Sequence, residues 1–287
     1  MVGVDRLLPP ELERQIFETD AVLYPETIAN LLLVAAQVLE WIEPLRYRTF
    51  TIMSSPSSCP RFRLLKKAIQ YKSAPFIHDH VWHLLADRDK NYEPGPFSDI
   101  LRSCTGLRSH VFFHVHPHML SHLQALRPLR LSAPLGSVFG GGEVKEFTVD
   151  FTLPMFSSIT HLDVFDTLEL DPWGSWSAIG LLPRLTHLAF LELSNTWADK
   201  ILVTCPRLLV LISMYSEEPT HLAASDRESS DPRFLSMVLA TDACTLDWQT
   251  GIQGGMDFWA RADVFVAKKS RGEIELSSFC YASLADY

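Results

Sequence analysis

The chain has 287 residues, of which 47% are hydrophobic and 21% charged, a balance typical of a globular protein with a substantial core. Its formal net charge of −9 argues against general binding to nucleic acid, and no apolar run approaches the roughly 18 residues that span a membrane. The 5 cysteines lie far apart without a Cys-x-x-Cys pair. This spacing predicts reduced thiols in a cytoplasmic or nuclear protein and no disulfide framework.

The first fifty residues predict three short helices. A proline pair begins the first helix, in which Leu12 and Ile16 are four residues apart and share a face that Phe17 widens. A break at Tyr24–Thr27 precedes the second helix, and Pro44 is expected to end the third. Because so small a unit holds little core of its own, we expect another surface to cover part of it.

The same residues carry a resemblance to a known family. The segment Leu8–Leu12 reads Leu-Pro-Pro-Glu-Leu, and Ile16-Phe17, Leu31–Val34 and Trp41 with Leu45 follow in order. This block resembles an F-box, and the chain is similar to the F-box-like proteins of mushroom-forming fungi. The resemblance implies docking on the linker subunit of a cullin-RING ubiquitin ligase, with the rest of the chain selecting a target protein. The candidate docking residues are Pro9, Leu12, Ile16, Phe17, Leu31 and Trp41.

An alternative interpretation makes the helices of residues 5–50 a structural cap. In that case the same leucines pack against the downstream domain, and the protein is an interaction scaffold unconnected with a ligase. Residues 51–96 are expected to form a helical linker or cap, in which a basic amphipathic helix covers Arg61–Lys72 between two loops.

From residue 97 to 225 the sequence repeats an apolar-x-x-apolar-x-apolar pattern. It begins at Leu126, Ile159 and Leu185, in partial form at Leu208, and in weaker form at Leu107. Most of the steps fall near the spacing of leucine-rich repeats. We therefore predict an irregular leucine-rich-repeat-like solenoid with a parallel sheet on its concave side, backed by helices and suited to protein recognition.

Three further elements are expected around this pattern. Alternation over Val144–Leu153 predicts a half-buried strand. Residues 226–287 are expected to form a helical C-terminal cap and tail that shield the last repeat, with one helix beginning at Pro232 and another over Phe258–Lys269. Trp173 and Trp176 are expected either to rim a target-binding surface or to close a loop over the core.

A catalytic or metal role has weak support in the sequence. Most of the histidines lie between residues 78 and 122, which leaves a histidine-metal enzyme as a rival hypothesis, but no metal-binding signature spaces them. There is no Gly-x-Ser-x-Gly motif, and Cys104 and Cys205 recur at equivalent repeat positions that favour packing on the sheet. We therefore expect a non-enzymatic α/β protein without cofactor or metal, which binds proteins and neither nucleic acid nor membrane.

Overall fold

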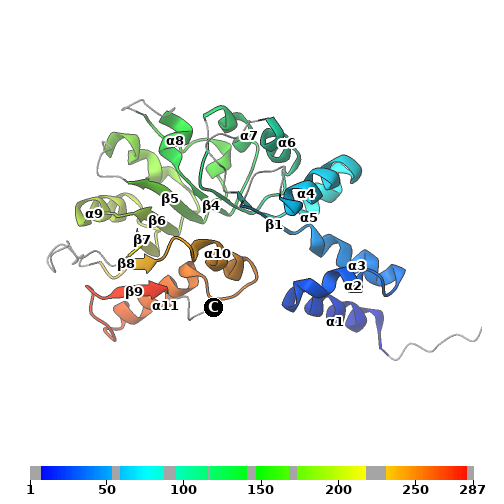
Figure 1. Cartoon of the computed structure of the whole chain (residues 1–287). Coiled ribbons are helices and arrows are strands. Elements are labelled where there is room, and N and C mark those ends of the chain that lie inside the picture. Colours follow the sequence, from blue (N-terminus) through cyan, green and yellow to red (C-terminus); the bar gives the residue numbers. More distant parts are fainter. Residues whose placement is uncertain are drawn as a thin grey trace, which may run out of the picture.

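The computed structural model describes residues 8–53, 59–86, 95–115, 117–140, 147–167, 173–217 and 231–282. Within them, nine strands form one sheet in which every neighbouring pair is parallel and the order follows the chain (Figure 1). The strands are β1 (Thr49–Ile52), β2 (His83–Ala86), β3 (Ser109–Phe112), β4 (Arg130–Ala133), β5 (His161–Thr167), β6 (His187–Leu191), β7 (Val210–Tyr215), β8 (Phe234–Leu239) and β9 (Phe279–Ala282). This arrangement confirms the predicted mixed α/β fold with a parallel sheet.

Helices cover both faces of the sheet. The outer face carries α4 (Pro60–Tyr71), α5 (Ala74–His80), α6 (Gly95–Ser103), α7 (Leu120–Leu123), α8 (Leu135–Gly140) and α9 (Asn195–Thr204), together with the 3₁₀ turns η2 (Pro117–Met119), η3 (Pro154–Phe156), η5 (Trp173–Ser175) and η6 (Ser177–Leu181). The inner face carries α10 (Cys244–Ile252) and α11 (Phe258–Ser270), seen below the sheet in Figure 1. The main core lies between the sheet and the outer helices.

The strand register shows which residues repeat. Leu131 of β4 pairs with His110 of β3 and Leu162 of β5, and all three side chains are buried toward the outer helices. The sequence pattern places Leu129 at that position, but Leu129 precedes the strand and is 43% exposed. The predicted repeat at Leu126 is thus two residues out of register, because closely spaced leucines satisfy the pattern in more than one frame.

The sheet extends past both ends of the predicted repeat region. Strand β1 spans the boundary between the N-terminal helices and the expected linker of residues 51–96, and β2 lies within that linker. Strands β8 and β9 lie within the expected helical cap. The helix predicted to begin at Pro232 is wrong, since Phe234–Leu239 is strand β8. Its side chains alternate: Phe234 joins the core of the outer face, whereas Leu235 and Met237 join the cluster on the inner face.

The strand predicted over Val144–Leu153 is also not found. Residues 144–146 lie outside the described residues, and 147–153 form an irregular segment in which Val149 donates a backbone hydrogen bond to the carbonyl of Ser175 at 3.1 Å. Phe147 and Phe151 pack against Trp176 from this segment. Alternation marked the buried side chains correctly, but the 3₁₀ turn η5 and not a strand supplies the backbone partner of Val149.

The helices α10 and α11 are part of the inner face and do not close the end of the sheet. Helix α11 confirms the predicted helix over Phe258–Lys269, and its buried Phe258, Trp259 and Ala262 pack with inner-face side chains of strands β6 to β8. This second apolar cluster covers the surface that the sequence suggested as the concave recognition face. These two helices do not lie at the terminal edge of the sheet, because β9, which follows α11 in the chain, pairs with β8 and forms that edge.

The N-terminal helices form a separate small unit, the helical unit, which projects from the β1 end of the sheet (Figure 1). It consists of α1 (Pro10–Leu23), the 3₁₀ turn η1 (Pro25–Thr27), α2 (Ile28–Leu31) and α3 (Ala36–Arg46). Ala21, Val38 and Ile42 form its own core. Pro44 lies inside α3 instead of ending it, and the helix continues for two more residues.

Candidate functional site

Helix α1 carries apolar side chains on two opposite faces. At 100° per residue, Leu12, Ile16 and Leu23 fall within one narrow stripe, whereas Phe17 and Ala21 point the other way. Ala21 is buried against α3, and the ring of Phe17 lies 6.4 Å from that of Trp41 on α3. The face of Phe17 and Ala21 therefore packs the helical unit together, whereas the stripe of Leu12, Ile16 and Leu23 is exposed to solvent.

The side chains of the stripe stay exposed. Leu12 is 47% exposed, Ile16 is 54% exposed and Leu23 is 64% exposed. Together with Leu8, Gln15, Thr19, Asp20 and Tyr24 they line a shallow groove along the helix. Apolar side chains gathered on one protruding helix are typical of a surface that another protein covers.

Local hydrogen bonds fix the end of α1 beside this groove. The Thr27 hydroxyl donates to the carbonyl of Tyr24 at 2.8 Å and lies 3.1 Å from the carboxylate of Asp20. Arg14 and Glu18 form an ion pair at 2.8 Å one turn apart on the same helix. Prolines 9 and 10 begin the helix, where the absence of a backbone N–H leaves no bond unmade. The groove is consequently built on a helix whose C-terminal end is held by side-chain hydrogen bonds.

The predicted docking residues divide into two groups. Pro9, Leu12 and Ile16 are exposed, whereas Phe17, Leu31 and Trp41 are half-buried and pack around the core of the helical unit. The sequence placed Phe17 on the same face as Leu12, but the structure turns it toward α3. Phe17, Leu31 and Trp41 therefore support the stripe from behind rather than lining it.

Sequence reasoning missed several exposed apolar side chains. Leu23 lies seven residues after Ile16 and continues the stripe, so helical periodicity contained this signal. Leu33 and Val34 are exposed in the turn between α2 and α3, where periodicity gives no information.

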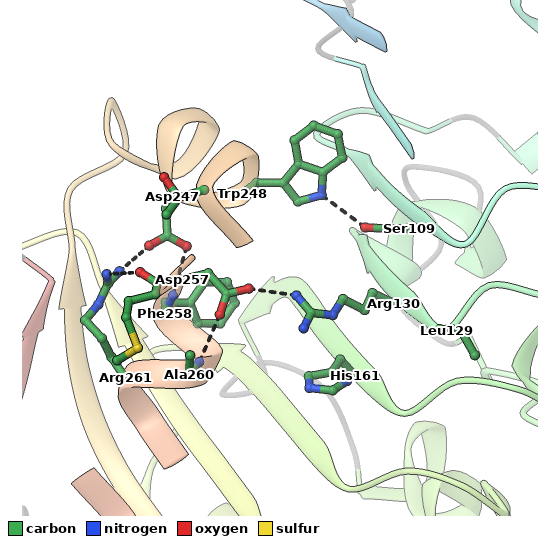
Figure 2. A network of polar contacts seen from close by, with 12 residues as sticks. Ser109, Leu129, Arg130, His161, Asp247, Trp248, Asp257, Phe258, Ala260 and Arg261 are labelled. Carbon is green, nitrogen blue, oxygen red and sulfur yellow. Dashed lines mark hydrogen bonds and ion pairs between the residues drawn. The ribbon is translucent and has the colours of Figure 1, made fainter. Parts of the chain in front are cut away.

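The inner face of the sheet is closed by polar contacts as well as by the apolar cluster. Figure 2 shows Trp248 of α10 donating its indole N–H to the hydroxyl of Ser109 on β3 at 3.1 Å, and Arg130 of β4 pairing with Asp257 at 2.7 Å. Asp247 of α10 pairs with Arg261 of α11 and accepts the backbone N–H of Phe258 at 3.0 Å. Gln249 adds a bond to Thr51 of β1 at 3.1 Å.

Two histidines lie under α11. His161 and His187 stack with ring centroids 4.1 Å apart, and both contact the edge or face of Trp259. His187 also lies 3.0 Å from the carboxylate of Asp263. Burial, followed by the neighbouring His187 and Arg130, lowers the pKa of His161 to about 3. His161 is thus a neutral packing residue at neutral pH.

The expected target-binding rim is not formed by the two tryptophans. Trp176 is 1% exposed and packs against Phe190 in the outer core, so the prediction that it rims a binding surface is wrong. Trp173 is half-buried, packs against the same core and lies 5.2 Å from the ring of Trp197 on α9. Both tryptophans close the outer layer over the sheet, the other role foreseen for them.

The histidine-rich segment does not converge on a metal centre in the described part of the chain. No group of three or more histidine, cysteine, aspartate or glutamate side chains suited to a metal ion occurs there. His110 is fully buried, and burial lowers its pKa to about 3. Cys104 and Cys205 are buried as predicted, and burial raises their pKa values to about 12 and about 11. Such thiols are poor nucleophiles because the reactive thiolate is disfavoured.

No helix in the described residues is long and apolar enough to cross a membrane. A comparison with the models of known protein families gives no match. A comparison with curated proteins gives none either.

Proposed function

We propose that the protein is a substrate receptor of a cullin-RING ubiquitin ligase, in which the helical unit docks on the linker subunit and the rest of the chain holds a target protein. The receptor performs no chemistry itself, and its contribution is to bring the target close to the ubiquitin-transfer machinery. The resemblance of residues 8–45 to an F-box supports this assignment.

The observation that carries the proposal is the exposed stripe of Leu12, Ile16 and Leu23 on a helix that already has a buried apolar face. If the helical unit were only a cap, these side chains would be expected against the first repeat. Instead the unit has its own core, and its contact with the sheet domain includes a peripheral ion pair of Glu43 with Lys72 at 2.6 Å. The scaffold alternative therefore has less support than docking.

The test is binding of the purified full-length chain to a fungal linker subunit, measured by titration calorimetry. We expect a complex, and we expect the double substitution Leu12→Asp and Ile16→Asp to weaken it at least about tenfold, since each buried apolar side chain contributes roughly 1.5–3 kcal/mol. Phe17 is unsuited to this test because its loss would damage the core of the helical unit.

A matched control is Leu181→Asp with Val203→Asp, which places two charges on exposed apolar positions of the outer layer. This control is expected to bind the linker subunit like the unaltered chain. Circular dichroism and thermal unfolding must show that both double variants remain folded. Absence of a complex with the unaltered chain, or equal weakening by both pairs, would rule out the proposed docking.

A further inference from the structure

A basic cluster lies at the N-terminal ends of the first strands of the sheet. Arg48, Trp82 and Arg108 each directly precede a strand, β1, β2 and β3 respectively. Their backbones are tied in a row, since Trp82 N–H donates to the carbonyl of Arg48 at 3.1 Å and Arg108 N–H donates to that of Trp82 at 2.7 Å. The three side chains therefore occupy equivalent positions in successive repeats.

The two arginines hold the indole between neighbouring repeats. The guanidinium carbon of Arg48 lies 4.5 Å from the centroid of the Trp82 ring, and that of Arg108 lies 3.9 Å from it. The indole N–H of Trp82 donates to the carbonyl of Asp79 at 2.6 Å, which fixes the ring. Stacking on an aromatic ring orders a guanidinium while its N–H groups remain available at the rim.

Within the described residues no acidic side chain forms an ion pair with this cluster, although the nearby carboxylate of Glu18 on α1 acts to raise the pKa of Arg48 against the larger lowering by burial. Among the described residues, no carboxylate lies within ion-pair distance of Arg48 or Arg108, and neither guanidinium donates a hydrogen bond to a protein acceptor. Arg130 lies one strand further along, but Asp257 pairs with it at 2.7 Å. After burial, the charges of Arg48, Arg108 and Arg130 help to lower the pKa of His83 to about 4. The cluster is thus a local positive site on a chain whose net charge is −9.

We propose that the Arg48–Trp82–Arg108 cluster binds an acidic segment of a partner protein, one that presents two negatively charged groups followed by an apolar residue. Because both guanidiniums lie over the same indole, their carbon atoms are no more than about 8.4 Å apart, a distance that side chains two positions apart in an extended segment can match. The apolar residue is required because exposed Leu129 continues the row, its N–H bonded to the carbonyl of Arg108 at 2.8 Å. Nucleic acid is disfavoured because the net charge of the chain repels a long polyanion.

This inference does not require the docking proposed above, because it rests on side chains at the start of the first strands, although Arg48 also lines a pocket with Glu18 and Leu23 of α1. The negative groups can be carboxylates of Asp and Glu or the phosphate of a modified serine, since guanidinium binds both in the same bidentate manner. The inner face of the sheet is occupied by α10 and α11, whereas Arg108 and Leu129, which directly precede β3 and β4, are exposed.

The experiment uses the full-length chain without any ligase subunit and three fluorescent peptides of one length. One contains a Glu-Glu-Glu-Leu core, one contains two phosphoserines followed by leucine, and one contains Gln-Gln-Gln-Leu. We expect saturable anisotropy changes for one or both charged peptides, weakening as salt rises, and none for the glutamine peptide. Binding of only the phosphorylated peptide, with release by inorganic phosphate, identifies phosphate as the ligand, and binding of the glutamate peptide identifies carboxylates.

Arg108→Gln is the decisive variant because Arg108 is exposed and its loss leaves the core intact. We expect it to weaken binding about tenfold, and Arg48→Gln to do the same. Arg63→Gln, which removes an exposed arginine from α4, is the matched control and is expected to bind normally. The proposal is overturned if no charged peptide binds at about 1 mM, if the glutamine peptide binds equally well, or if Arg108→Gln binds like the unaltered chain.

Discussion

Arg130 and Asp257 form an ion pair at 2.7 Å although 127 residues separate them in the chain. Asp257 also caps α11 by accepting the backbone N–H of Ala260 at 2.9 Å. One carboxylate therefore both begins the last long helix and fastens it to β4. Through this pair and the bond from Trp248 to Ser109, the C-terminal helices close the inner face and make it part of the folded core.

We predict that Trp259→Ala lowers the free energy of unfolding by about 3–5 kcal/mol, because the indole is buried against His161 and His187. Val264→Ala, at an exposed position of the same helix, is expected to change it by no more than about 0.5 kcal/mol. Chemical denaturation of both variants measures the difference. A loss below about 1 kcal/mol for Trp259→Ala would mean that α11 does not pack firmly on the sheet.

His110→Leu is expected to stabilise the protein. His110 occupies a register position held by leucine in the neighbouring strands, and both of its ring nitrogens are buried without a hydrogen-bond partner in the described residues. Replacing an unsatisfied buried polar group with an apolar one of similar shape should raise the free energy of unfolding by about 1–3 kcal/mol. His122→Leu, at a partly exposed position, serves as the control and should have little effect. A destabilised His110→Leu would show that this ring is needed where it lies.

Gly106→Ala is expected to destabilise the protein by about 2 kcal/mol or more, since overpacking forces the backbone to move. A Cβ atom at this position would lie 1.8 Å from the carbonyl oxygen of His78, the backbone of α5. Gly174→Ala is the matched control because no atom of the described residues lies within 4 Å of its added Cβ. Thermal unfolding of the two variants should separate them clearly, and equal melting temperatures would contradict the close approach of α5 to the start of β3.

Stability should fall as the pH is lowered below about 6.5. Burial lowers the pKa of His83 to about 4 and those of His110 and His161 to about 3. Near pH 5 these three histidines are therefore protonated in the unfolded chain and neutral in the folded chain, a difference of about three protons. Burial raises the pKa of Asp163 to about 7, which opposes this by one proton. Unfolding at pH 5 should therefore take up about two protons, a slope on the order of 2–3 kcal/mol per pH unit. Denaturation at a series of pH values measures it, and a flat profile from pH 4.5 to 6 would contradict the burial of these rings.

Asp163→Asn tests the opposing contribution. Because the folded-state pKa of Asp163 is raised, its carboxylate destabilises the folded protein. This destabilisation is absent below about pH 4 and complete above about pH 7. The variant should thus gain stability relative to the unaltered chain at pH 8 and lose that advantage in acid. Exposed Asp199→Asn is the control and should show the same pH profile as the unaltered chain. An advantage of Asp163→Asn that does not change with pH would mean that its cause is not ionisation.

The sequence by itself determined those features that depend on neighbours along the chain. The helices beginning at the proline pair, the basic helix α4 and helix α11 follow from periodicity, and the recurrent leucines indicated a parallel sheet. The same local signals failed where they fit two frames, as at Leu129, or where alternation and helical spacing overlap, as at Phe234–Leu239.

Only the tertiary structure decided which apolar surfaces remain exposed. Spacing places Leu12, Ile16 and Phe17 close together on α1, but the position of Trp41 on α3 determines that Phe17 turns inward and Leu12 and Ile16 do not. Likewise, nothing local to Asp257 or Trp248 specifies that their partners lie on β4 and β3, respectively, more than a hundred residues earlier. Contacts between distant segments are set by packing of the whole chain, so both the closed inner face and the basic cluster at Arg48 and Arg108 emerged only in three dimensions.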